Sequence, residues 1–107
     1  MEEVISKDIS KDDVFSVLSS RRRRCVLEVL SEGSGGVSVK DLAEEVVSLE
    51  KGKPLGEVTT MERKSVYVSL YQNHLQKMDR LNAIEYNRKT NKIEDINEDF
   101  LNIYKKI

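Results

Sequence analysis

The feature that most limits the possible folds is a long helical segment that leads directly into two short alternating segments. Thr59 and Glu62 have the spacing of a capping box, and apolar residues recur at helical spacing for about twenty residues after them. These apolar positions are Val66, Leu70, Leu75, Met78 and Leu81. Residues 83–88 alternate between apolar and polar, and a turn at 89–91 leads into a second segment at 92–96. The sequence therefore predicts one long helix followed by a β-hairpin.

Three further helices are expected before the long one. The first begins at the acidic residues Asp12 and Asp13, and the second runs from Arg21 to about Glu32 and ends in the glycine-rich turn 33–36. A short strand and a capping box from Ser38 to Asp41 introduce the third helix, which should stop before the loop 51–58. The positions expected on the inner faces of these helices are Val14, Phe15, Leu18, Val26, Leu27, Val29, Leu30, Leu42, Ala43, Val46 and Leu49.

Length and composition favour one folded domain that spans residues 1–107. Apolar residues make up 38% and charged residues 35%, a composition typical of a folded, soluble protein with a small core rather than of a disordered chain. No apolar run is long enough for a membrane span and the acidic start does not resemble a signal peptide, so a cytoplasmic protein is expected. Cys25 is the only cysteine, so an intrachain disulfide, a cysteine zinc site and a two-cysteine redox motif are excluded. No metal and no cofactor are expected.

Positive charge is concentrated in one part of a chain whose net charge is −1. Residues 51–92 carry 9 basic and 4 acidic side chains, an excess of +5, whereas 1–20 sum to −3, 21–50 to −1 and 93–107 to −2. The position of the charges, rather than their sum, decides whether a surface can attract a polyanion. The long helix and the hairpin therefore lie in the segment best suited to meet nucleic acid.

Three segments carry a resemblance to a known family. They are VFSVLSSRRRRCVLEVL at 14–30, VSVKDLAEEV at 37–46 and SLYQNHLQKMDRLNAIEY at 69–86. In order and spacing they resemble archaeal winged-helix proteins related to the ArsR and MarR transcription regulators, and ERKSVYVSLYQNHL is similar to an archaeal subgroup of such domains. The resemblance implies a winged helix-turn-helix: mainly α, with a small β-hairpin as the wing.

Two departures from the family pattern affect function. Metal-sensing ArsR members carry a pair of cysteines in the third helix, where this chain has Leu-Ala-Glu-Glu at 42–45, so metal sensing is not expected. The loop 51–58 is also longer than the tight turn of a standard helix-turn-helix. The geometry between the third and the long helix therefore does not follow from the resemblance.

The long helix of a winged helix enters the major groove, and its outward side chains read base edges. With Leu70, Leu75 and Met78 facing inward, the helical register places four polar side chains outward. These candidates for base contacts are Ser69, Gln72, Asn73 and Gln76. Amides can read adenine through paired hydrogen bonds, although a solvated polar face is the alternative for any surface helix.

Phosphate contacts are expected from cations on the long helix and the hairpin. The candidates are Arg63, Lys64, Lys77, Arg88, Lys89 and Lys92, and the alternative for each is a solubilising surface charge. The run Arg21–Arg24 opposes the dipole of its own helix, so it needs a compensating contact and is interpreted as partly structural. His74, Tyr67 and Tyr71 are interpreted as packing or surface residues rather than as ligands.

The last helix, expected over 97–107 with Asn97 as its cap, carries an apolar stripe of Phe100, Ile103, Tyr104 and Ile107. Winged helices of the resembled family commonly dimerise through elements that flank the DNA-binding core. The stripe is therefore expected at a homodimer interface, with packing against its own domain as the alternative.

The sequence best fits a small transcription regulator that binds double-stranded DNA sequence-specifically as a homodimer. A winged-helix module that binds another protein and no DNA remains as the alternative, because fold does not decide between the two. No catalytic spacing and no phosphate-binding glycine loop are present, so an enzyme is not expected. No membrane and no small-molecule effector are indicated.

Overall fold

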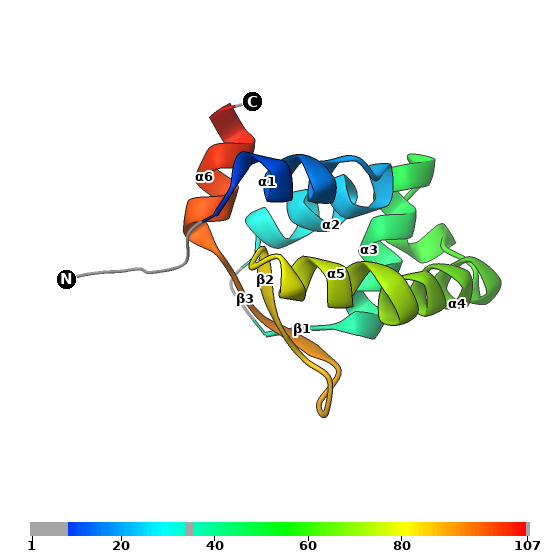
Figure 1. Cartoon of the computed structure of the whole chain (residues 1–107). Helices are drawn as coiled ribbons and strands as arrows, with labels where there is room; N and C mark the ends of the chain where they lie inside the picture. The colour runs from blue at the N-terminus through cyan, green and yellow to red at the C-terminus, as the bar shows by residue number, and fades with distance from the viewer. Residues whose placement is uncertain (1–8, 34–35, 107) are drawn as a thin grey trace.

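The chain folds into helices packed over a small antiparallel sheet, and the β-hairpin projects from the helical part (Figure 1). The structure, a computed structural model, describes residues 9–33 and 36–106. The elements are α1 (Lys11–Leu18), α2 (Arg21–Ser31), β1 (Val37–Ser38), α3 (Val39–Lys51), the 3-10 helix η2 (Leu55–Glu57), α4 (Thr60–Ser69), the π-helix η3 (Leu70–His74), α5 (Leu75–Arg80), β2 (Ile84–Asn87), β3 (Lys92–Ile96) and α6 (Glu98–Lys106). The mainly helical architecture with a small sheet, and the order of its elements, are confirmed.

Local capping explains where the helices begin. The Ser38 hydroxyl accepts a hydrogen bond from the Asp41 amide at 3.1 Å, but the reciprocal half of the expected capping box is not among the hydrogen bonds of the described residues. The box at Thr59 and Glu62 is complete: Glu62 N donates to Thr59 Oγ1 at 3.1 Å, and Thr59 N donates to Glu62 Oε1 at 2.9 Å. This box fixes the residue at which the long helix starts.

The long helix runs from α4 through η3 to α5 without leaving helical backbone angles. Within η3 the helix widens, and Leu75 N donates to Leu70 O, five residues back. The sequence predicts the helix but not this widened turn. Asn82 ends the helix with φ of 66°, the left-handed conformation expected there.

One hydrophobic core joins the helices to the sheet. Leu70, Leu75 and Met78 are fully buried in it, as their register predicts. Two predicted core positions are wrong. Phe15 is 54% exposed, because α1 buries Val14 and Val17 instead. Leu49 is 45% exposed, because the buried face of α3 follows Val39, Leu42, Ala43, Val46 and Val47, a set that leaves Leu49 on the outside.

The sheet has the strand order β1-β3-β2, with both neighbouring pairs antiparallel. Val37 lies opposite Ile93 on one side of β3, and Tyr86 lies opposite Ile93 on the other. A register shift between Glu85 and Tyr86 bends β2. Residues 88–91, called the hairpin turn below, connect β2 to β3.

The terminal helix α6 packs against its own domain. Asn97 Oδ1 accepts hydrogen bonds from Asp99 N at 2.9 Å and Phe100 N at 3.4 Å, which confirms the predicted cap. Phe100 is fully buried in the core, so the expectation that it lies at a dimer interface is wrong. Ile103 and Tyr104 are half-buried, and Ile107 lies outside the described residues. No helix in the described segments is both long enough and apolar enough to cross a bilayer.

Candidate nucleic-acid interface

Asn91 ties the hairpin turn to the long helix and to the start of α3. Its Nδ2 donates to the Tyr67 hydroxyl at 2.8 Å, and its Oδ1 accepts from the Tyr86 hydroxyl at 3.0 Å. Its backbone oxygen accepts from Val39 N at 2.9 Å, and its φ is 56°. Burial raises the pKa of Tyr86, so its hydroxyl keeps the proton that it donates. The hairpin turn is therefore held at a defined position beside the long helix.

Two stacked tyrosines extend this contact along the helix. The rings of Tyr67 and Tyr71 lie 6.2 Å apart between centroids with planes 12° apart. Tyr67 is half-buried against the core, which agrees with the predicted packing role, whereas Tyr71 is 38% exposed. The stack leads from the hairpin turn to the outer surface of the helix.

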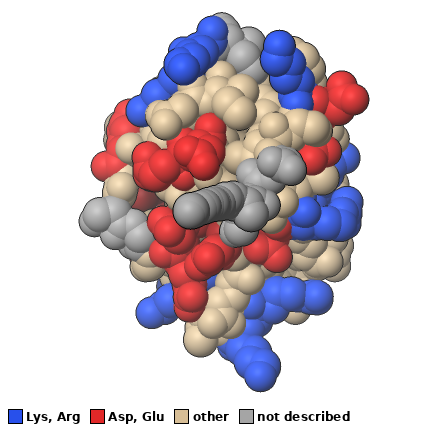
Figure 2. Space-filling view, turned by 60° about the vertical axis from the view of Figure 1, so that its left-hand side comes forward, with Lys and Arg blue, Asp and Glu red and all other residues tan. Residues whose placement is uncertain are grey.

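The hairpin carries three exposed cations, Arg88, Lys89 and Lys92. None of them forms an ion pair with any other described residue. Figure 2 shows basic side chains at the lower end of the molecule, the level of the hairpin in Figure 1, with acidic side chains gathered above them. The three cations are therefore open to a ligand, although Glu85 and Glu94 line the same surface depression as Arg88 and Lys89.

The cations predicted on the long helix differ in availability. Lys64 is exposed, whereas Arg63 is half-buried, with its Nε 3.8 Å from Glu44 Oε1. Lys77 is half-buried on α5. Lys64 is therefore the cation of this set on the long helix that is most open to a ligand.

The four predicted base contacts do not form one group. Gln72 and Asn73 are exposed in η3, and Ser69 is half-buried. Gln76 is half-buried, and its Nε2 donates to the Tyr71 backbone oxygen at 3.0 Å, across the widened turn. That bond engages the Gln76 amide within its own helix. Of the predicted base contacts, Gln72 and Asn73 are therefore the ones whose side-chain amides form no hydrogen bond with another described residue.

Sequence reasoning missed an apolar row on the outside of α4. Met61 is 81% exposed and Val68 is 48% exposed, with Lys64 between them and Tyr71 after them. Spacings of three, four and seven residues place all four side chains on one side of a helix, called the outer stripe below. The signal in the sequence is that Met61 and Val68 lie outside the register of Val66 and Leu70.

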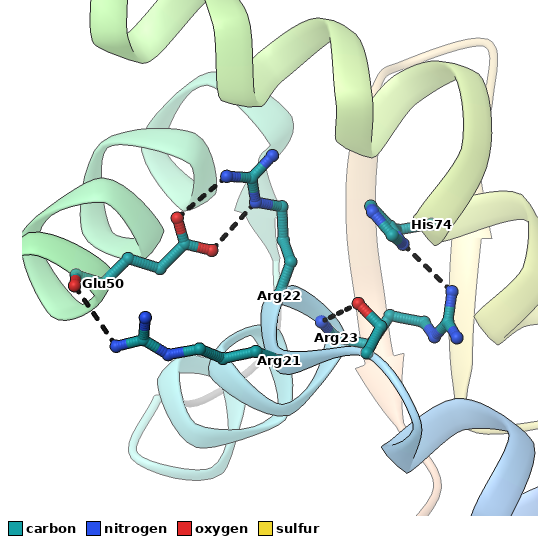
Figure 3. A network of polar contacts seen from close by, with 6 residues as sticks. Arg21, Arg22, Arg23, Glu50 and His74 are labelled. Carbon is teal, nitrogen blue, oxygen red and sulfur yellow. Dashed lines mark hydrogen bonds and ion pairs between the residues drawn. The ribbon is translucent and has the colours of Figure 1, made fainter.

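The arginine run at the start of α2 binds the ends of two other helices (Figure 3). Arg22 forms a two-point ion pair with the Glu50 carboxylate, with distances of 2.8 and 2.9 Å, and Arg21 Nη2 donates to the Glu50 backbone oxygen at 3.3 Å. The hydrogen bond to Arg22 lowers the pKa of Glu50 and in turn raises the pKa of Arg22. Both arginines therefore lie at the C-terminal end of α3, where cations are favourable.

Arg23 is 7% exposed and caps the C-terminal end of α1. Its Nε donates to Val17 O at 2.9 Å, and its Nη2 donates to Ser16 O at 2.9 Å and to Ser19 Oγ at 3.1 Å. Its Nη1 lies 3.1 Å from His74 Nδ1 in η3 (Figure 3). Burial and then the charge of Arg23 lower the pKa of His74, so the neutral ring accepts this bond. These contacts show that Arg21, Arg22 and Arg23 have structural roles.

A comparison with protein families identifies the domain. A family model described as "Domain of unknown function (DUF7344)" matches residues 15–94, more than half of the chain. The chain belongs to this family. The DUF7344 match begins in α1 and ends in β3, so it includes the arginine run, the long helix and the hairpin. A search of curated proteins and a search of solved structures each found no match.

The loop between α3 and α4 of the DUF7344 domain is anchored at the start of the long helix. Lys53 Nζ lies 2.8 Å from Glu62 Oε1, and this bond, followed by the one from Thr59 N, lowers the pKa of Glu62 to about 2. The predicted loop 51–58 contains η2, and α3 extends to Lys51, where Gly52 caps it with φ of 64°. In the described part of the chain, no three His, Cys, Asp or Glu side chains form a group that could hold a metal ion.

Proposed function

We propose that this DUF7344 protein is a winged helix-turn-helix transcription regulator that binds duplex DNA sequence-specifically and without catalysis. In this proposal the long helix enters the major groove and the β2–β3 hairpin is the wing. The strand order β1-β3-β2, with the long helix directly before β2, supports it. So does the resemblance of the sequence to archaeal relatives of the ArsR and MarR regulators.

The observation that carries the proposal is the β2–β3 hairpin, whose three cations lie in and directly after the hairpin turn, beside an exposed face of the long helix. Arg88, Lys89 and Lys92 have no carboxylate partner among the described residues, and Asn91 holds their turn against Tyr67. Cations carried on a turn that is held in one place suit phosphate contacts, which set the register of a protein on DNA. Lys64 on the long helix is assigned the same role.

Gln72 is assigned to base reading, because its amide is exposed and is four residues beyond Val68 on the long helix. We expect Gln72→Ala to weaken binding to a duplex selected from a random pool by about 1–3 kcal/mol and to relax the preference at one base pair. Titrations against the selected and a scrambled duplex measure both effects.

Gln76→Ala is the matched control, because the Gln76 amide is bonded to the Tyr71 carbonyl of its own helix. This variant should keep the base preference of the wild type. An equal loss on selected and scrambled DNA for Gln72→Ala would contradict its role in base reading. Failure of the wild-type protein to enrich any duplex would contradict the proposed function itself.

We also propose a homodimer, with the interface shifted from Phe100 to the surface around Phe15. Phe15 is 54% exposed and lines the same surface depressions as Ile103 and Tyr104, between α1 and α6. Burial of such side chains contributes about 1.5–3 kcal/mol each before the cost of association. A dimer would also suit two half-sites on DNA.

Sedimentation at tens of micromolar tests the dimer. The wild type should sediment as a dimer and Phe15→Glu as a monomer, because the substitution places a charge in the interface. Leu49→Glu, at a similarly exposed apolar position on α3, should remain dimeric. A monomeric wild type, or a dimeric Phe15→Glu variant, would exclude this interface.

A module that binds protein instead of DNA is the second candidate. The net charge of −1 and the acidic side chains gathered on the face in Figure 2 favour it. This candidate predicts no measurable affinity for duplex DNA even at low salt, where electrostatic binding is strongest. The selection experiment above therefore separates the two functions.

A further inference from the structure

The outer stripe of α4 combines exposed apolar groups with a cation. Met61 and Val68 are separated by seven residues, two turns of helix, and Lys64 lies between them. Single exposed apolar residues are normal on protein surfaces and need no special function. Here two of them share one row of the helix that the proposed function assigns to the major groove.

The hairpin turn lies next to this row. The Tyr67 hydroxyl, on the long helix, accepts a hydrogen bond from the Asn91 side chain in the turn. The Tyr71 ring stacks on Tyr67 and belongs to the outer stripe. A duplex that meets the cations of the hairpin turn would therefore also meet the outer stripe.

The outer stripe also lies in the N-terminal half of the long helix. In helix-turn-helix proteins, the N-terminal residues of the recognition helix are the ones that contact base edges. At the major-groove edge of the base pairs, the 5-methyl group of thymine is the apolar group available, and it is contacted by apolar side chains. The β-branched Val68 has few rotamers to lose when it is buried in such a contact.

We propose that Met61 and Val68 contact thymine 5-methyl groups, so that the preferred duplex contains thymine at the base pairs under the outer stripe. This inference rests on the proposed function and adds to it a class of base pair. Lys64, between the two apolar side chains, supplies a charged contact within the same footprint.

The test compares thymine with uracil, which keeps every hydrogen-bonding group of thymine but lacks the methyl group. A duplex enriched by the wild-type protein from a random pool is synthesised once with thymidine and once with deoxyuridine. The wild type should bind the deoxyuridine duplex more weakly, by about fourfold for each methyl group contacted. Because methyl loss can also alter DNA shape, the ratio of the two affinities is compared between variants.

Val68→Ala and Met61→Ala should each lower the thymine-to-uracil ratio towards one, because the side chain that meets the methyl group is gone. Both substitutions are at exposed helical positions, and alanine favours the helix, so the variants should fold. Leu49→Ala removes an exposed apolar side chain from α3 and should keep the wild-type ratio.

Three outcomes would overturn the inference. Equal affinity of the wild type for both duplexes would show that DNA is bound without methyl contacts and would leave the proposed function intact. An unchanged ratio in both alanine variants would show that the outer stripe lies off the DNA, as expected if it docks on a protein. If no duplex is enriched, both the proposed function and this inference fail.

Discussion

Replacing Arg23 by methionine is expected to lower the free energy of unfolding by about 2–4 kcal/mol. The guanidinium caps α1 through the carbonyls of Ser16 and Val17, and it also binds Ser19 and the neutral ring of His74. Methionine fills a similar volume but leaves these acceptors without a donor. Water cannot easily replace the donor, because Arg23 is only 7% exposed. Urea unfolding followed by circular dichroism measures the loss.

Two further variants separate this network from charge alone. Arg23→Lys keeps the charge but cannot supply the planar set of donors, so an intermediate loss is expected. Arg24→Met removes an exposed arginine whose side chain makes one hydrogen bond to the described residues, to Leu18 O, and should cost about 1 kcal/mol or less. If Arg23→Met were as stable as Arg24→Met, the capping role of Arg23 would be wrong.

Local signals in the sequence were enough to predict the α-helices and the hairpin, but not η2 or η3. The capping box at Thr59, the left-handed Asn82 and the cap at Asn97 act within a few residues, so the sequence places them correctly. Errors arose where burial depends on distant partners. Phe15 and Leu49 are apolar at helical spacing, yet the neighbouring helices cover other residues of the same helices.

Phe100 shows the same limit in the opposite direction. Its stripe at the end of the chain suggested a surface for a second copy, but the domain has a place for this ring in its own core. Whether an apolar stripe packs internally depends on how much core the other helices leave uncovered. That quantity is a property of the assembled fold and not of the segment.

The candidate site was predictable in part. Charge clustering and the turn signal predict the cations of the hairpin, and their side chains are exposed in the structure. The widened turn η3 has no clear sequence signal, and its backbone geometry engages the Gln76 amide while Gln72 stays free. The helix-dipole argument predicts that the arginine run needs compensating contacts. It does not predict the partners, which lie on α1, α3 and η3 and reach the arginines only through tertiary packing.

The hairpin carries the largest expected effect on DNA binding. Replacement of Arg88, Lys89 and Lys92 by alanine should weaken binding to selected and scrambled duplexes alike, because phosphate contacts carry no sequence information. The loss should be greatest at low salt. A variant with alanine at Lys51, Arg80 and Lys106 changes the net charge equally at exposed positions of α3, α5 and α6, outside the hairpin and the proposed dimer surface, and it should bind nearly as well as the wild type.

The salt dependence of binding tests most directly whether the hairpin lies on the DNA backbone. Each phosphate contact steepens the plot of log affinity against log salt by about 0.9, so the hairpin variant should have a slope shallower by roughly 2.7 than the wild type. The control variant should keep the wild-type slope. A hairpin variant whose slope equals that of the wild type would show that Arg88, Lys89 and Lys92 do not touch phosphates, and would contradict the account.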